Sequence, residues 1–112
     1  MRNYYALKGG VIYLLKCLVT GDYYVGQTTN VGNRFCSHMY GIMFPKRNKG
    51  KSKLDDLKRK YPSLKVWNFQ VLEEGIPKER LNEREVYWIN FYDSYEKGLN
   101  STRGNGIKKK KK

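Results

Sequence analysis

The residue with the most unusual position in this sequence is a glutamate that interrupts an apolar helical stripe. Four apolar residues after Pro77 have the spacing of one helix face: Leu81, Trp88, Ile89 and Tyr92. Glu85 falls in the middle of that face, where an unpaired carboxylate would be very costly to bury. Two explanations are open. Glu85 forms a salt bridge with a cation such as Arg34, or it binds a hard metal such as Mg²⁺ together with water and phosphate oxygens.

Few other residues could form a metal site. His38 is the single histidine, so a site built from several histidines cannot exist within one chain. Cys17 and Cys36 form no CxxC pair, which excludes a zinc knuckle and makes a disulfide scaffold a poor explanation. Arg34 and His38 are four residues apart and therefore share one face of the helix expected there. The residue types thus favour a single carboxylate as the metal ligand.

The charge of the chain indicates a polyanionic partner. The 112 residues carry 23 Lys and Arg against 10 Asp and Glu, a formal net charge of +13. Nine of these cations and two acids fall within residues 45–66, a net of 9 − 2 = +7. A solvated basic face is the alternative for one such run, but two runs of the same sign favour contact with nucleic-acid phosphates. The candidate DNA-contacting residues are Lys46, Arg47, Lys49, Lys51 and Lys53.

The length predicts one domain, residues 1–107, followed by a disordered polylysine tail, Lys108–Lys112. The tail could be a nonspecific DNA arm, a localisation-type signal or a remnant of cloning. No apolar run approaches the roughly 20 residues of a membrane helix, and the N-terminus lacks the apolar core of a signal peptide. We therefore expect an intracellular protein with reduced thiols, in the cytoplasm or nucleoid, or in the host cell if a phage encodes it.

Hydrophobic patterning predicts a β-hairpin and a helix in the first half of the chain. Gly10–Leu18 and Tyr23–Gln27 are rich in β-branched and aromatic residues and flank a Thr-Gly-Asp turn signal. Asn30 can cap a helix that runs to about Tyr40, with Gly41 as its stop.

The second half predicts two helices separated by a strand. Ser52 can cap a helix over Lys53–Tyr61, which Pro62 ends. Leu64–Leu72 is expected to be the third strand, and Pro77 to open a long helix to about Tyr92. The order β-β-α-α-β-α predicts an α+β domain with about three helices.

These motifs together resemble those of the GIY-YIG nuclease family. Val11-Ile12-Tyr13 and Tyr24-Val25-Gly26 match the paired signature, although Val11 stands in place of the first glycine. Arg34 and His38 match the family's arginine and histidine, and Glu85 matches its catalytic glutamate. Gly98-Leu99-Asn100 matches the closing Gly-x-Asn motif. The match spans Gly10 to Asn100, nearly the whole chain.

The resemblance implies a three-stranded antiparallel sheet flanked by helices, with an active site of Tyr13, Tyr24, Arg34, His38, Glu85 and Asn100. Tyr13 would be the general base or a water-positioning phenol; as a base it needs nearby cations to depress its pKa from about 10. Arg34 would contact two phosphate oxygens, and Glu85 would anchor one Mg²⁺ or Mn²⁺. Tyr24 and His38 would orient the phosphate or relay a proton, and Asn100 would support the site's geometry.

The resemblance therefore implies a divalent-metal-dependent DNA endonuclease, of which homing-type or phage mobile-element nucleases are the nearest in style. The alternative is a noncatalytic nucleic-acid-binding module that keeps the fold. A binder of anionic membranes is the weakest alternative, because the chain lacks an amphipathic anchor. Homing enzymes usually carry an appended DNA-reading region, so we expect low sequence specificity, a separate specificity partner or dimer, or a truncated chain.

Overall fold

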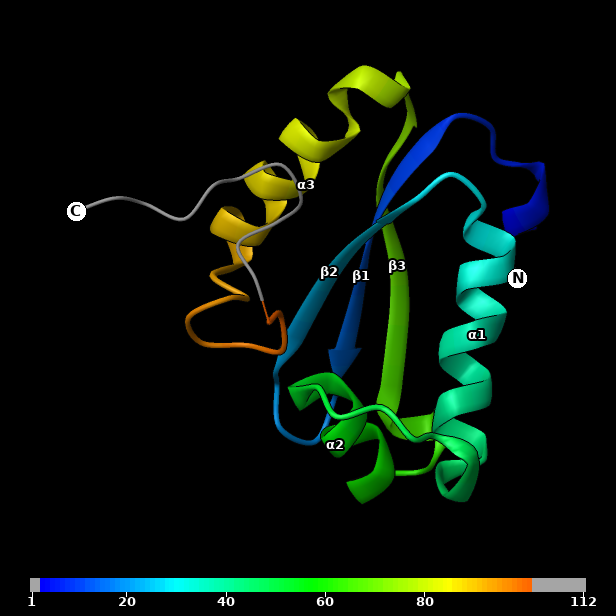
Figure 1. Ribbon diagram of the computed structural model, residues 1–112, viewed down its shortest axis with the longest axis vertical. Helices are drawn as coiled ribbons and strands as arrows, with labels where there is room; N and C mark the ends of the chain where they lie inside the picture. The colour runs from blue at the N-terminus through cyan, green and yellow to red at the C-terminus, as the bar shows by residue number, and fades with distance from the viewer. Residues whose placement is uncertain (1–2, 102–112) are drawn as a thin grey trace.

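The computed structural model describes residues 3–101, which form one sheet, three α-helices and three short 3-10 turns (Figure 1). The elements in chain order are η1 (Tyr4–Ala6), β1 (Gly10–Cys17), β2 (Tyr23–Thr28), α1 (Val31–Met43), η2 (Pro45–Arg47), α2 (Lys53–Lys60), η3 (Leu64–Val66), β3 (Trp67–Ile76) and α3 (Lys78–Tyr92). The predicted α+β order is confirmed. The predicted tail, Lys108–Lys112, lies outside the described residues.

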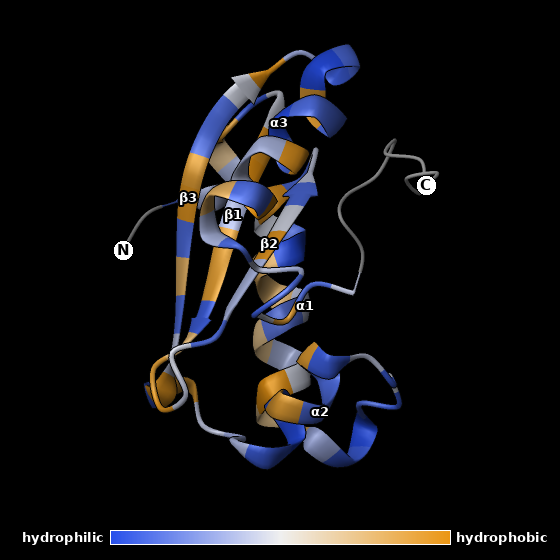
Figure 2. Cartoon of the chain, turned by 90° about the vertical axis from the view of Figure 1, so that its left-hand side faces the viewer, coloured by the Kyte–Doolittle hydropathy of each residue, from blue (hydrophilic) through white to orange (hydrophobic). Residues whose placement is uncertain are grey.

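The sheet is antiparallel, and β1 lies in the middle between β2 and β3. Side chains of β1 alternate between two hydrophobic cores. Ile12 and Leu14 pack on the α3 side, whereas Leu15 and Cys17 pack toward α1 and α2. Figure 1 shows α3 and α1 on opposite sides of the sheet, with α2 near its lower end. Along β3, hydrophobic and hydrophilic residues alternate in bands (Figure 2). The two cores hold the sheet as a rigid layer between the helices.

The starts of α1 and α2 were predicted correctly, but the ends of both helices differ from the prediction. Asn30 and Ser52 cap α1 and α2, each accepting a hydrogen bond from the backbone amide three residues later. Helix α1 continues past Gly41 to Met43, because Ile42 is fully buried in the core and extends the apolar face. The helix ends just before Pro45, as expected for residues that precede a proline. Helix α2 ends at Lys60, one residue earlier than predicted.

The third strand begins and ends later than predicted. Leu64–Val66 is a 3-10 turn that Ser63 caps, and β3 runs from Trp67 to Ile76. Pairing with β1 fixes these bounds, since Trp67 lies opposite Cys17 and Ile76 lies opposite Gly10. Cross-strand partners, which the hydrophobic pattern of one segment does not reveal, therefore determine the extent of this strand.

Candidate active site

A cleft of about 860 Å³ opens where β2, α1, α2 and α3 meet the segment that follows α3. Five of the six predicted catalytic residues line it: Tyr24, Arg34, His38, Glu85 and Asn100. The sixth, Tyr13, is fully buried behind the cleft wall. Residues separated by up to 87 positions (100 − 13) therefore gather around one strand, β2.

Tyr13 owes its position to a glycine on the neighbouring strand. It lies directly opposite Gly26 in the β1–β2 register. A Cβ atom on Gly26 would collide with the ring and hydroxyl of Tyr13, so the glycine lets the phenol lie across β2. On its other side the ring stacks on Phe69, with the centroids 5.1 Å apart. The two strands thus fix the direction in which the Tyr13 hydroxyl points.

His38 connects Tyr13 to a lysine that sequence reasoning did not select. The His38 Nε2 atom lies 2.9 Å from the Tyr13 hydroxyl, and the His38 Nδ1 atom lies 2.8 Å from Nζ of Lys58. All three side chains are buried, with Lys58 only 5% exposed and His38 8% exposed. The imidazole therefore uses both of its nitrogens inside the protein.

The charge states of this pair follow from burial. Burial lowers the pKa of His38 to about 3, and the charges of Lys58 and Arg34 act in the same direction. Burial also lowers the pKa of Lys58 to about 8, which the carboxylate of Asp55 opposes. Near neutral pH, His38 is therefore neutral and Lys58 is a cation.

Both tyrosines are neutral phenols. Burial raises the pKa of Tyr13 well above the ordinary value; Arg34 acts in the expected, lowering direction but is outweighed. Burial likewise raises the pKa of Tyr24, and the Glu85 charge adds to this effect. The Tyr13 and Tyr24 rings are neighbours, with their centroids 6.2 Å apart.

Glu85 is 7% exposed and is oriented by a glutamine. Nε2 of Gln27 donates to Oε1 of Glu85 at 2.8 Å and to Oδ1 of Asn82 at 2.7 Å. Within residues 3–101, no three His, Cys, Asp or Glu side chains gather into a metal-binding cluster. A hard carboxylate oxygen on a cleft wall fits an ion such as Mg²⁺, which usually keeps several waters and takes only one or two carboxylates from a protein.

Asn100 binds the backbone of β2. Its Oδ1 accepts from the Val25 amide, and its Nδ2 donates to the Val25 carbonyl, both at 2.8 Å. The backbone amide of Leu99 donates to the Tyr23 carbonyl at 2.8 Å. These bonds bracket Tyr24, so the Gly-Leu-Asn segment fixes the strand from which Tyr24 reaches the cleft.

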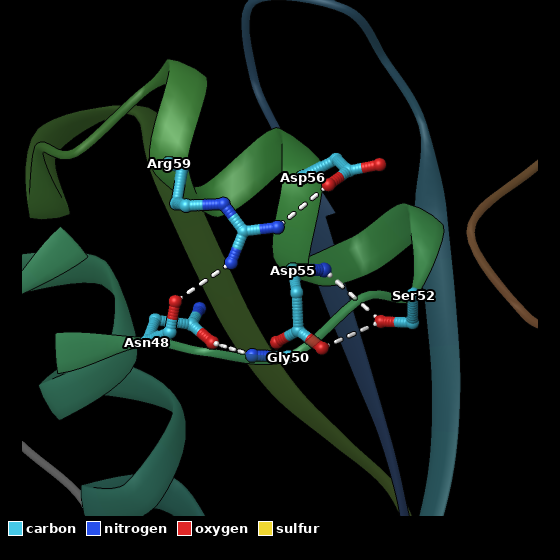
Figure 3. Close-up of polar contacts among 6 residues, drawn as sticks. All are labelled: Asn48, Gly50, Ser52, Asp55, Asp56 and Arg59. Atoms are coloured by element: carbon cyan, nitrogen blue, oxygen red, sulfur yellow. Dashed lines mark hydrogen bonds and ion pairs between the residues drawn. The ribbon is translucent and has the colours of Figure 1, made fainter. Parts of the chain in front are cut away.

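The five predicted DNA-contacting cations are all exposed and lie in η2, the following loop and the first turn of α2. This segment adjoins the site, because Ser52, Leu54 and Asp55 line the cleft. Most of this segment is hydrophilic (Figure 2). The loop is tied to α2 by polar contacts, which Figure 3 shows. Arg59 donates to the Asn48 carbonyl at 2.7 Å, and the Ser52 hydroxyl donates to Asp55 at 2.8 Å. The exposed cations therefore project from a braced loop.

Comparison with known proteins identifies the family. Residues 9–100 match the GIY-YIG catalytic domain. The chain belongs to the GIY-YIG catalytic domain family. Among solved structures, the catalytic domain of the homing endonuclease I-TevI is similar with a TM-score of 0.68 and 27% identity, over 84% of this chain and 99% of that one. A glutamate-to-alanine mutant of the catalytic domain of intron endonuclease I-TevI gives a TM-score of 0.70 and 26% identity, over 85% and 96% of the respective chains. No curated protein matches the chain.

This GIY-YIG domain is a nuclease domain, and its fold agrees with that of the I-TevI catalytic domain. Two cleft residues were missed in the sequence: Gln27, which orients Glu85, and Lys58, which contacts His38. Lys58 falls four residues after the buried Leu54, the same spacing that made Glu85 conspicuous after Leu81, so a helical-face analysis could have found it. In the described part of the chain, no helix is long and apolar enough to cross a membrane.

Proposed function

We propose that this protein is a divalent-metal-dependent DNA endonuclease of the GIY-YIG type. The observation that carries the proposal is the convergence of Tyr24, Arg34 and Glu85 on one cleft, next to an exposed basic segment. A phosphate-binding cation, a hydroxyl and a metal-binding carboxylate are the groups that phosphodiester hydrolysis requires. The likeness to the catalytic domain of an intron endonuclease favours a role in a mobile element over one in restriction or repair.

The substrate is bound through its phosphates. The exposed cations between Lys46 and Lys53 contact the backbone on either side of the cut and place one phosphate in the cleft. Arg34 lines that cleft one helical turn before His38, and its planar guanidinium contacts two phosphate oxygens at once. Binding by phosphate contacts carries little sequence information, so the basic segment supplies affinity and register.

In the reaction, water attacks the phosphorus, the bond to the 3′ oxygen breaks, and the proton that the water loses is balanced by one that the 3′ oxygen takes up from solvent. Tyr24 presents its hydroxyl at the cleft and holds the attacking water. Tyr13 is a buried neutral phenol, so we assign it to orienting Tyr24 rather than to starting the reaction as a phenolate. Glu85, fixed by Gln27, would hold Mg²⁺ or Mn²⁺, which polarises the phosphate and stabilises the leaving oxygen when bound. Arg34 stabilises the charge that develops on the phosphate.

Plasmid cleavage tests the proposal. Supercoiled plasmid should be nicked or linearised with Mg²⁺ and remain intact with EDTA. Glu85→Gln is nearly isosteric and should lower the cleavage rate by orders of magnitude, because the metal contributes several kcal/mol to the transition state. Glu83→Gln is the matched control, since Glu83 is exposed on the same helix. A gel shift without cleavage by the wild-type protein would instead identify a noncatalytic nucleic-acid-binding module.

A further inference from the structure

One buried cation in this fold contacts a neutral histidine instead of a carboxylate. Nζ of Lys58 lies 2.8 Å from Nδ1 of His38, and the lysine is 5% exposed. Burying an ammonium group without a counter-ion in direct contact costs stability, so its position calls for a reason other than folding. Lys58 also lines the cleft, on the same wall as His38.

The charge of Lys58 determines which His38 nitrogen carries the proton. An ammonium group has three donors and no acceptor, so Nδ1 of His38 must accept from it. A neutral imidazole has one N–H, which must then be on Nε2. The Tyr13 hydroxyl, 2.9 Å from Nε2, therefore accepts from His38 and keeps its own proton for another partner. The neighbouring phenol that lines the cleft is Tyr24, whose ring centroid lies 6.2 Å from that of Tyr13.

We propose that Lys58 is a positioning residue of the nuclease site: it fixes the tautomer of His38, so that the Tyr13 hydroxyl accepts from His38 and keeps its proton for donation to Tyr24 at the cleft. This inference rests on the proposed nuclease function. The donors run in one direction, from Lys58 to His38 and from His38 to Tyr13. The cation at the buried end strengthens each donor along the chain, because charge-assisted and connected hydrogen bonds polarise one another.

Several charged or titratable groups face this pair. They are Tyr13 from β1, Tyr24 from β2, Arg34 from α1 and Asp55 from α2. Of these, Asp55 alone is acidic, and it acts to keep the Lys58 cation charged. Since the pKa of Lys58 is lowered to about 8, this charge is lost at mildly alkaline pH.

Nitrogen NMR tests the tautomer. The chain has one histidine, so its ring correlations need no assignment. In the wild-type protein at neutral pH, Nε2 should carry the proton and Nδ1 should have the shift of an unprotonated nitrogen. In Lys58→Gln, which lacks the cation, the pKa of His38 should rise, whereas Lys60→Gln, an exposed change on the same helix, should leave it unchanged. A wild-type His38 protonated on Nδ1, or equal pKa values in both variants, would overturn the assignment.

Cleavage kinetics test the role. At saturating plasmid, Lys58→Gln should cut about 10- to 100-fold more slowly than Lys60→Gln, by analogy with the loss of a partner that orients a metal-binding histidine. The ratio of the wild-type cleavage rate to the Lys58→Gln cleavage rate should be greatest below pH 8. It should fall as the pH rises past the pKa of Lys58, which is about 8. A role limited to packing would give a ratio independent of pH and would overturn the proposal.

The two proposals fail differently. If the wild-type protein cuts DNA and Lys58→Gln cuts as fast as Lys60→Gln, the role of Lys58 is refuted and the nuclease function stands. If the wild-type protein cuts no DNA with Mg²⁺ or Mn²⁺, the nuclease function is refuted and the role of Lys58 in it falls too. The His38 spectrum still reports the tautomer in that case, because it does not depend on cleavage.

Discussion

Replacing Lys58 with methionine should stabilise the protein while it impairs the site. Burial lowers the pKa of Lys58 from an ordinary 10.5 to about 8. At 1.36 kcal/mol per pH unit, this difference of about 2.5 corresponds to roughly 3 kcal/mol of cost for holding the charge in the fold. Methionine fills a similar volume without that cost, but it leaves Nδ1 of His38 without a donor, which costs about 1 kcal/mol. The net expectation is a gain of about 2 kcal/mol.

Thermal unfolding measures this gain. For a chain of 112 residues, 2 kcal/mol corresponds to a rise of about 8 °C in Tm at neutral pH. The gain in stability also depends on pH. Since the folded-state pKa is the lower one, the unfolded chain binds more protons between about pH 8 and 10.5, and the wild-type protein recovers stability through that window. The advantage of Lys58→Met should therefore shrink as the pH rises from 8 to 10.5.

Lys60→Met is the matched control, because it removes a cation from the exposed side of the same helix. It should change Tm by little at either pH. A Lys58→Met protein that is less stable than the wild type at neutral pH would refute the reasoning, since it would show that Lys58 contributes more through its contacts than its buried charge costs. An advantage that stays constant from pH 8 to 10.5 would show that the gain comes from packing and not from charge.

Three further outcomes follow from the site. Gly26→Ala should lower the free energy of unfolding by about 1–3 kcal/mol in chemical denaturation and slow cleavage, because the added methyl group displaces the Tyr13 ring. Gly41→Ala is the control, since a methyl group there makes only ordinary contacts, and it should leave stability unchanged or raise it. Equal losses of stability in the two variants would contradict this reasoning. Arg34→Lys keeps the charge but loses the bidentate guanidinium donor, so plasmid cleavage should fall strongly while DNA affinity changes little. Cleavage near the wild-type rate would show that Arg34 is only one more phosphate contact. The double change Lys49→Gln and Lys51→Gln should reduce the slope of log binding constant against log salt concentration by about 1.8, which is about 0.9 for each lost phosphate contact. An unchanged slope would show that the basic loop does not contact DNA.

Local signals predicted the parts of this structure that local chemistry controls. Asn30 and Ser52 were identified as caps because a side-chain oxygen before a helix meets a need that exists in any sequence context. The β1–β2 hairpin followed from its turn and its β-branched residues. The end of α1 did not follow, because Gly41 is a typical stop, and only the burial of Ile42 in the tertiary structure overrides it.

The candidate site also has residues that the sequence predicted and residues that only the structure reveals. The GIY-YIG motifs pointed to six residues, and the structure gathers five of them at the cleft and the sixth behind it. Lys58 is the first of three consecutive cations, and the composition of that run alone suggests a solvated helix face. Its significance depends on His38, which is 20 residues away in the sequence and 2.8 Å away in space. Gln27 likewise gains its role from Glu85 on another element.

The contact between Asn100 and β2 has a consequence for how the molecule behaves at high concentration. Strand β2 is an edge strand of the sheet, and an uncovered edge strand offers free amides and carbonyls to a strand of another molecule. Here the Val25 amide and carbonyl are both occupied by the Asn100 side chain, and the Tyr23 carbonyl by the Leu99 amide. The segment that supports the active site therefore also blocks intermolecular sheet extension. Variants of Asn100 that lose activity would be expected to self-associate as well, and light scattering on the same sample separates the two effects.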